Sequence, residues 1–153
     1  MAKLRAVLAG ALGGLAGAAL MAPVHMAAAE LAKQEAPKGE DATQKVAQTV
    51  VAKTTGRKLP RAQKAKAGQV VHFAFGAAMG ALYGLLAENF PFVTAGAGTL
   101  FGAAVYTGAH ALTVPALGLA PGPAENGAAR EAAELGSHVV YGVVTDAVRR
   151  ALS

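Results

Sequence analysis

Residues 6–29, AVLAGALGGLAGAALMAPVHMAAA, contain no Asp, Glu, Lys or Arg. A helix needs about 20 predominantly apolar residues to cross the hydrocarbon core of a bilayer, and this stretch is long enough. Residues 68–87, GQVVHFAFGAAMGALYGLLA, are also free of formal charge. Both stretches therefore predict transmembrane helices.

The composition of the whole chain favours the same class of protein. Hydrophobic residues make up 54 % and charged residues only 15 %, whereas soluble domains carry about 25 % charged residues. The 19 glycines fall inside the apolar stretches, where a soluble helix avoids them and a membrane helix accepts them. The absence of cysteine excludes disulfides and thiolate metal sites. We expect a single membrane domain over residues 1–153.

Two further spans follow the first pair. No formal charge occurs between Asn89 and Ala124, which predicts a third span over residues 92–114. The last element, residues 128–150, contains Asp146 in a short apolar run. It is compatible with a fourth span or with an interfacial helix, and we favour the span. The predicted fold is an all-α integral membrane bundle of about four transmembrane helices.

The N-terminal segment and the polar segment that follows it each allow a further prediction. Lys3, Arg5 and the small residues 27–29 are also typical of a signal peptide, but the apolar run is long and other spans follow, so we favour a retained span. The polar segment, residues 30–66, predicts a short amphipathic helix after Asp41 and a new start at Pro60.

The glycines predict how the spans pack. They recur four residues apart, about one helical turn, so they form grooves where two backbones approach closely. The same grooves are also suited to a homo-oligomer. The residues concerned are Gly10, Gly13, Gly14, Gly17, Gly76, Gly80, Gly84, Gly98 and Gly102.

The basic residues suggest a lipid partner. Nine of the 14 Lys and Arg lie between Lys33 and Lys66, beside an apolar stretch and with almost no aromatic residues among them. This placement is typical of a cytoplasmic loop facing anionic lipid, and we expect no nucleic-acid binding. The positive-inside rule then makes this side of the membrane cytoplasmic and places both termini outside.

The four histidines lie on four predicted helices toward that same side. We select His72, His110, Glu134 and His138 as the candidate polar or metal cluster, with His25, Glu125 and Glu131 as supporting residues. Glu134 and His138 are spaced i, i+4 and face the same way on a helix. Such a cluster is compatible with structural hydrogen bonding, which we favour, with metal or haem ligation, or with proton handling.

No motif for catalysis or phosphate binding occurs in the chain. Ser137 and His138 are adjacent and point about 100° apart on a helix, so they predict no nucleophile pair. There is no Gly-x-Ser-x-Gly, His-Glu-x-x-His or phosphate-binding loop. We therefore expect a protein that is not an enzyme, and no cofactor is the favoured expectation.

From about Val70 to Leu152 the chain resembles the YagU-like family of bacterial inner-membrane proteins. The residues that carry the resemblance, in order, are His72-Phe73, Gly76, Gly80, Tyr83-Gly84, Ala87-Glu88-Asn89-Phe90-Pro91, Gly98, Gly102, His110, Pro115, Gly118-Leu119, Pro121, Glu125-Asn126, Glu134, His138 and Arg149-Arg150. The chain departs from the family pattern in its shorter loop, in a last helix without tryptophan, and in Asp146 in place of Glu.

The resemblance implies a multi-pass protein of the bacterial inner membrane and a small helical bundle, and it supplies no biochemical activity. We expect a non-enzymatic envelope or stress-related protein whose histidine cluster holds the helices together or responds to pH. The alternatives are a metal- or haem-binding membrane protein and a small oligomeric transporter.

Overall fold

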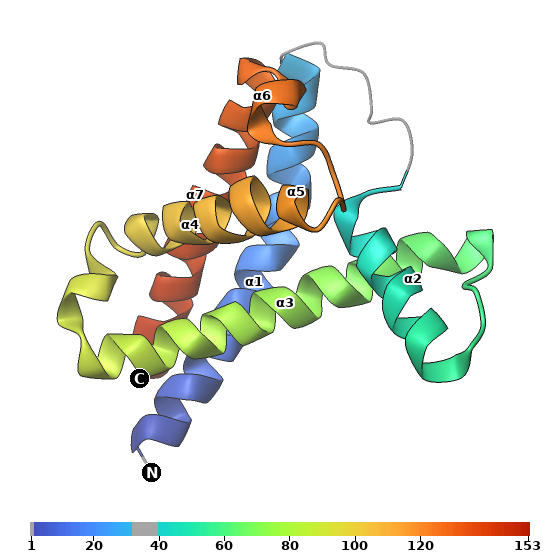
Figure 1. The fold of residues 1–153 in the computed structure, drawn as a ribbon. Helices are drawn as coiled ribbons and strands as arrows, with labels where there is room; N and C mark the ends of the chain where they lie inside the picture. Colours follow the sequence, from blue (N-terminus) through green and yellow to red (C-terminus); the bar gives the residue numbers. More distant parts are fainter. Residues whose placement is uncertain (1, 32–39) are drawn as a thin grey trace.

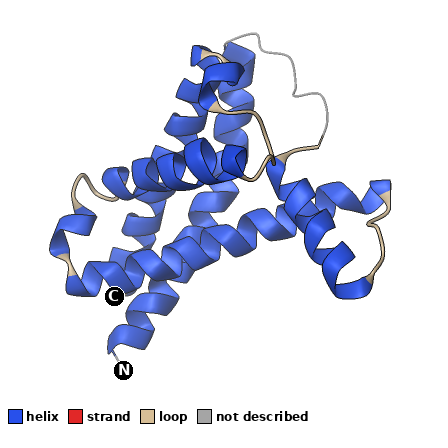
Figure 2. Ribbon diagram, viewed as in Figure 1, coloured by secondary structure: helices blue, strands red, loops and turns tan. Residues whose placement is uncertain are grey.

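The computed structural model describes residues 2–31 and 40–153, and these residues are helical without any strand (Figure 2). The all-α prediction is confirmed for this part of the chain. Positions 32–39 of the predicted polar segment lie outside the described residues. The helices are α1 (Ala2–Leu31), α2 (Ala42–Thr55), α3 (Arg61–Asn89), η1 (Pro91–Thr94), α4 (Thr99–Val105), η2 (Tyr106–Thr113), α5 (Val114–Ala116), α6 (Pro123–Asn126) and α7 (Ala128–Leu152).

α1 is the central helix. It packs against α3 on one side and against α7 on the other, and α4 covers α7 (Figure 1). α1 and α7 are antiparallel, because the Arg5 Nε near the start of α1 donates a hydrogen bond of 2.9 Å to the carbonyl oxygen of Leu152. The two chain termini consequently lie at the same end of the bundle (Figure 1). The end of α1 and the start of α7 meet at the other.

Glycines line the contact between α1 and α3. A Cβ on Gly10 would overlap the carbonyl oxygen of Gly80, and a Cβ on Gly14 would overlap that of Gly76. A Cβ on Gly84 would overlap the carbonyl oxygen of Ala6. The two backbones therefore touch directly, which maximises van der Waals contact between helices.

The contacts of α7 with α1 and α4 follow the same pattern. Gly13 and Gly17 of α1 lie against the backbone of Thr145 and Tyr141. A Cβ on Gly98 would overlap the carbonyl oxygen of Gly142, and Gly102 similarly lies against the backbone of His138. Side chains larger than hydrogen are thus excluded at the selected glycines on all three contacts.

Aromatic rings fill the space where the helices cross. Tyr83 of α3, Phe101 of α4 and Tyr141 of α7 are all less than 10 % exposed. The rings of Tyr83 and Phe101 lie 4.6 Å apart and those of Phe101 and Tyr141 6.2 Å apart, within the range of favourable aromatic contact. Met21 and Val105 complete this core.

The polar segment folds largely as its sequence predicts. Asp41 caps α2 by accepting a hydrogen bond of 2.8 Å from the Gln44 backbone N–H. Gly56 ends the helix in the left-handed conformation, with φ 68°. Pro60 precedes the first residue of α3, which begins seven residues before the predicted span at position 68.

The third helix starts later than the sequence predicts. Residues 92–98, placed in the span, form the short 3-10 helix η1 and a turn instead. Gly96 and Gly98 have φ of 64° and 86°, and Ala97 has φ of 52°, and all three values are incompatible with an α-helix. From Thr99 the chain is helical to Ala116, with the π-helix η2 in the middle.

Two helices of the described residues are long and apolar enough to cross a membrane. They are Lys3–Ala28 within α1 and Arg61–Asn89, which is α3. The helix from Thr99 is broken into three parts, and α7 carries charged residues at both ends. The predicted third and fourth spans therefore do not meet the same criterion.

Candidate functional site

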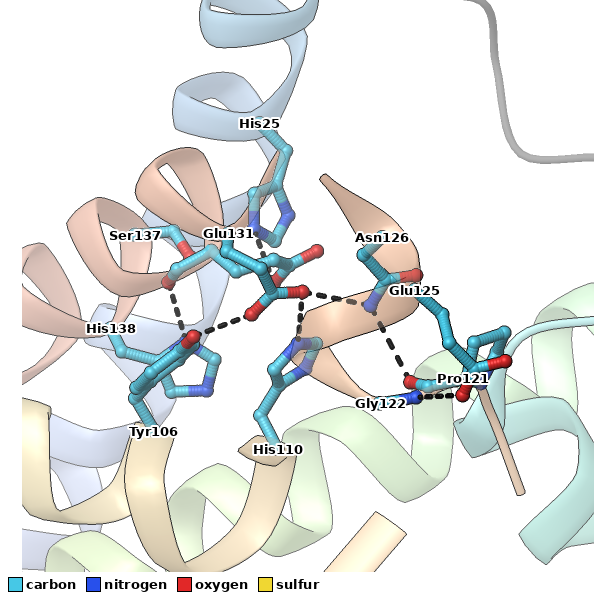
Figure 3. A network of polar contacts seen from close by, with 11 residues as sticks. His25, Tyr106, His110, Pro121, Gly122, Glu125, Asn126, Glu131, Ser137 and His138 are labelled. Atoms are coloured by element: carbon cyan, nitrogen blue, oxygen red, sulfur yellow. Dashed lines mark hydrogen bonds and ion pairs between the residues drawn. The ribbon is translucent and has the colours of Figure 1, made fainter. Parts of the chain in front are cut away.

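A group of polar side chains lies where the end of α1, the π-helix η2 and the start of α7 come together (Figure 3). We call it the histidine cluster, and its members share contacts with Glu131 or Glu134. They are His25, Tyr106, His110, Asn126, Glu131, Glu134 and His138.

Glu131 is the hub of the cluster. Its Oε2 accepts a hydrogen bond of 2.5 Å from the Tyr106 hydroxyl, and its Oε1 accepts one of 2.7 Å from the Asn126 amide. His110 Nε2 lies 3.5 Å from Oε1, which is a long contact. The side chain is only 12 % exposed. A carboxylate surrounded by donors in this way is held in its ionised, accepting form.

Glu134 contacts His25 across the α1–α7 contact. The His25 Nε2 and the Glu134 Oε2 lie 3.1 Å apart, which is an ion-pair separation. The His25 Nε2 is nevertheless buried without an aligned hydrogen-bond partner among the described residues. The two groups are thus close enough for an ion pair but are not aligned for a hydrogen bond. We interpret the contact as electrostatic rather than as a directed hydrogen bond.

The tautomer of His138 follows from its partner. Its Nδ1 lies 2.7 Å from the backbone carbonyl oxygen of Glu134, and a carbonyl oxygen only accepts. Nδ1 therefore carries the hydrogen, and in the neutral ring Nε2 is an acceptor. The ring lies edge-on to Tyr106 at 5.7 Å and 6.0 Å from the ring of His110.

The π-helix η2 brings Tyr106 and His110 to the cluster. π-helical turns are rare and occur often at functional sites. Here the rings of Tyr106 and His110, four residues apart, stack at 5.3 Å with an interplanar angle of 20°. Both side chains therefore reach Glu131 from the same helix (Figure 3).

His72 and Glu125 have other partners. His72 Nε2 donates a hydrogen bond of 3.1 Å to the carbonyl oxygen of Ala18, which ties α3 to α1. Glu125 Oε1 accepts from the Gly122 backbone N–H at 3.2 Å and closes the first turn of α6 (Figure 3). In the part of the chain that the structure describes, His72 shares no hydrogen bond or ring contact with His110, Glu134 or His138.

Among residues 2–31 and 40–153, no three His, Asp or Glu side chains converge as metal ligands would. The Ser137 hydroxyl donates to the carbonyl oxygen of Glu134 at 2.8 Å and is thus occupied in helix bonding. The histidine cluster thus places two imidazoles, those of His25 and His110, beside carboxylates.

A second polar group, which the sequence did not predict, surrounds Asp146. We call it the aspartate cluster: Tyr83, Asp146, Arg149 and Arg150. The Tyr83 hydroxyl donates to Asp146 Oδ1 at 2.8 Å, and the two arginines reach the same carboxylate at 3.0 and 2.7 Å. The spacing i, i+3, i+4 from Asp146 is a signal for the arginine contacts. Nothing in the sequence indicates Tyr83, 63 residues away.

Comparison with known proteins gives one result. The family model described as "Protein of unknown function (DUF1440)" matches residues 52–147. The match covers more than half of the chain and includes α3, α4, η2 and most of α7, and it agrees with the resemblance seen in the sequence. No curated protein and no solved structure matches the chain.

Proposed function

The chain belongs to the YagU-like family of proteins of unknown function (DUF1440), and from that premise we propose that it is a multi-pass protein of the bacterial inner membrane, without enzymatic activity, whose histidine cluster responds to pH. The proposal has two parts. The first concerns the membrane, and the second concerns the histidine cluster.

The membrane part rests on which residues of the long helices are buried. Small residues face the neighbouring helices, and large apolar residues face outward. On α1 most buried positions are Gly10, Gly14 and other small residues, with the larger Met21 among them, while Leu4, Leu8 and Leu12 are more than half exposed. A helix in water buries its large apolar side chains, because that removes them from solvent. A helix in lipid has no such need and gains instead from close backbone contact. This observation carries the proposal that the bundle is embedded in a membrane.

α3 shows the same arrangement. Gly76, Gly80 and Gly84 are buried, while Val70 and Phe75 are 68 % and 45 % exposed. We propose that α1, α3, the helix from Thr99 to Ala116 and α7 are the four spans, with the basic segment 40–66 on the cytoplasmic side. Reporter fusions at the C-terminus test this topology, and a C-terminus in the cytoplasm would contradict it.

The pH part rests on two imidazole–carboxylate contacts, His25 with Glu134 and His110 with Glu131. Each contact becomes an ion pair when its imidazole is protonated, and an unperturbed imidazole titrates at about pH 6.5. His138 faces the same space, so its protonation would add repulsion and oppose the effect. We propose that the stabilisation from these two contacts exceeds the repulsion from His138, because each of the two imidazoles has a carboxylate within 3.5 Å.

The experiment compares His110→Ala with the unchanged protein in detergent at about pH 5.5 and pH 8. The melting temperature of the unchanged protein should be higher in acid, because the stability from a protonated imidazole beside a carboxylate is lost as the pH rises. His110→Ala should reduce this difference. Equal melting profiles for the two proteins would contradict the pH role.

The same preparation tests the metal- or haem-binding alternative. Its metal content and visible absorption spectrum, compared with those of a variant with His72, His110 and His138 replaced by Ala, would reveal a bound group. A stoichiometric metal or a haem band that is lost in the variant would replace our proposal. We expect none, because His72 lies on the carbonyl oxygen of Ala18 and the described residues form no ligand set.

A further inference from the structure

The elbow between α2 and α3 encloses an open hollow of about 780 Å³. Three basic side chains line it, Lys45 from α2 and Arg61 and Lys64 from the start of α3, together with the carboxylate of Glu40. Lys64 Nζ lies 2.6 Å from Glu40 Oε1. The lining therefore keeps an excess of positive charge and offers several N–H donors.

The walls of this hollow are held in place. Ala47 of α2 is 4 % exposed. A Cβ added to Gly68 of α3 would lie 2.8 Å from the Gln44 side chain, so the missing side chain lets α2 lie directly on α3. With α2 also capped by Asp41, the basic side chains project from a fixed pair of helices. The hollow is thus formed by the fold rather than by one loose loop.

The depth of the hollow along α3 matches that of a lipid phosphate. Lys64 and Arg61 precede the charge-free run that begins at Ala67 by about 4.5 and 9 Å, at 1.5 Å per helical residue. The headgroup layer occupies the roughly 5–8 Å on each side of the hydrocarbon core. If α3 crosses the membrane, Lys64 therefore starts at the inner edge of the headgroup layer and Arg61 at its outer edge.

From this juxtaposition of charge and depth we infer that the hollow binds the phosphate group of an anionic phospholipid from the adjacent leaflet. Arg61 offers a planar fork of N–H donors that suits a phosphate, and Lys45 offers a point charge from the facing helix. Leu59 and Ala65 also line the hollow. The inference rests on the proposed membrane insertion of α3.

The experiment titrates phosphatidylglycerol into the full chain, purified in a neutral detergent, and counts retained lipids by native mass spectrometry. Phosphatidylcholine and inorganic phosphate are titrated in parallel. A Lys45→Gln/Arg61→Gln variant removes two charges from the hollow. The matched control, Lys53→Gln/Lys66→Gln, removes two exposed charges from the same region that do not line it.

A hydrogen bond to a charged group contributes at least about a tenfold gain in binding, so the hollow variant, which loses two such donors, should bind phosphatidylglycerol at least about 100-fold more weakly. The control should change by less than about fivefold. Lys45→Arg, which keeps the charge and leaves the Arg61 fork in place, should retain binding and shows that the site tolerates substitution.

Equal weakening in the hollow variant and the control would overturn the inference in favour of diffuse attraction. No weakening in either would overturn it outright, and competition by inorganic phosphate at the same concentration as lipid would assign the site to free phosphate. Release of the chain from bacterial membranes by an alkaline carbonate wash would instead contradict the proposed membrane insertion, so the two failures are distinguishable.

Discussion

Asp146, near the end of α7, accepts a hydrogen bond from Tyr83 and contacts from two arginines while only 1 % exposed. Glu134, about 18 Å earlier on the same helix, has one misaligned imidazole as its side-chain partner and is 18 % exposed. The aspartate cluster is thus closed and fully bonded, whereas the histidine cluster is partly open and incompletely bonded.

The difference separates two uses of a buried carboxylate. A carboxylate whose partners are permanently charged holds its surroundings in one arrangement at every ordinary pH, because arginine does not release its proton. A carboxylate beside imidazoles has partners whose charge changes near neutrality. The aspartate cluster therefore holds the helices together at every ordinary pH. We expect the interactions of the histidine cluster, at the other end of α7, to change with pH.

The largest expected effect comes from removing the closed carboxylate. Asp146→Ala leaves two arginines and a buried tyrosine hydroxyl without their acceptor, and the loss of one partner of a buried ion pair costs about 3–5 kcal/mol. The free energy of unfolding, measured by titrating the detergent-solubilised protein with a denaturing detergent, should fall by this amount. A loss below about 1 kcal/mol would show that the aspartate cluster is not a structural tie.

Removal of only the long-range partner should cost less. Tyr83→Phe deletes one hydrogen bond between α3 and α7 but leaves Asp146 with both arginines. Hydrogen bonds between membrane helices contribute about 0.6 kcal/mol on average and at most about 1.7. The same unfolding titration should give a loss in this range. A value as large as that of Asp146→Ala would mean that the arginine contacts contribute little.

At the open end the equivalent change should be smaller. Glu131→Gln keeps an oxygen that accepts from Tyr106 and removes the charge that faces His110. Its new N–H faces the Asn126 amide, which has to turn over so that its oxygen accepts. Because no donor is then left without an acceptor, we expect a loss of about 0.5 kcal/mol. The decrease in melting temperature at about pH 8 measures this loss of stability. A decrease larger than that caused by Tyr83→Phe would contradict the smaller structural role that we assign to the histidine cluster.

The smallest effect at neutral pH is expected for His25→Ala. Its side chain is 37 % exposed, and an exposed ion pair contributes at most about 1 kcal/mol. The expected signature is a reduced gain in melting temperature on going from about pH 8 to pH 5.5, since the imidazole beside Glu134 stabilises the fold only when protonated. An unchanged gain would place the pH response elsewhere.

The sequence predicted features whose causes are local. Asp41 and Pro60 mark helix starts through the side chain of the first and the backbone preference of the second, and the structure begins a helix after each of them. The convergence of His110 and His138 also follows from counting the direction of each helix. His72 was misplaced because the predicted spans did not give the rotation of α3, which directs that ring onto α1.

The remaining features depend on contacts between distant residues. The late start of the helix at Thr99 requires left-handed backbone at Gly96 and Gly98, and the second of these lies against Gly142, which the linear sequence does not reveal. The bond between Tyr83 and Asp146 depends on where α3 crosses the bundle. The π-helical turns that align Tyr106 with Glu131 have no local signature either.

The glycine faces of α1 have a consequence for the order in which the protein is assembled. Gly10 and Gly14 contact α3, whereas Gly13 and Gly17 contact α7, which leaves the ribosome after α3. The first helix can pair with α3 early in synthesis, but its other groove stays empty until α7 has been made. During that interval the groove is open to any helix with small residues, and it is covered only when its own partner has been made.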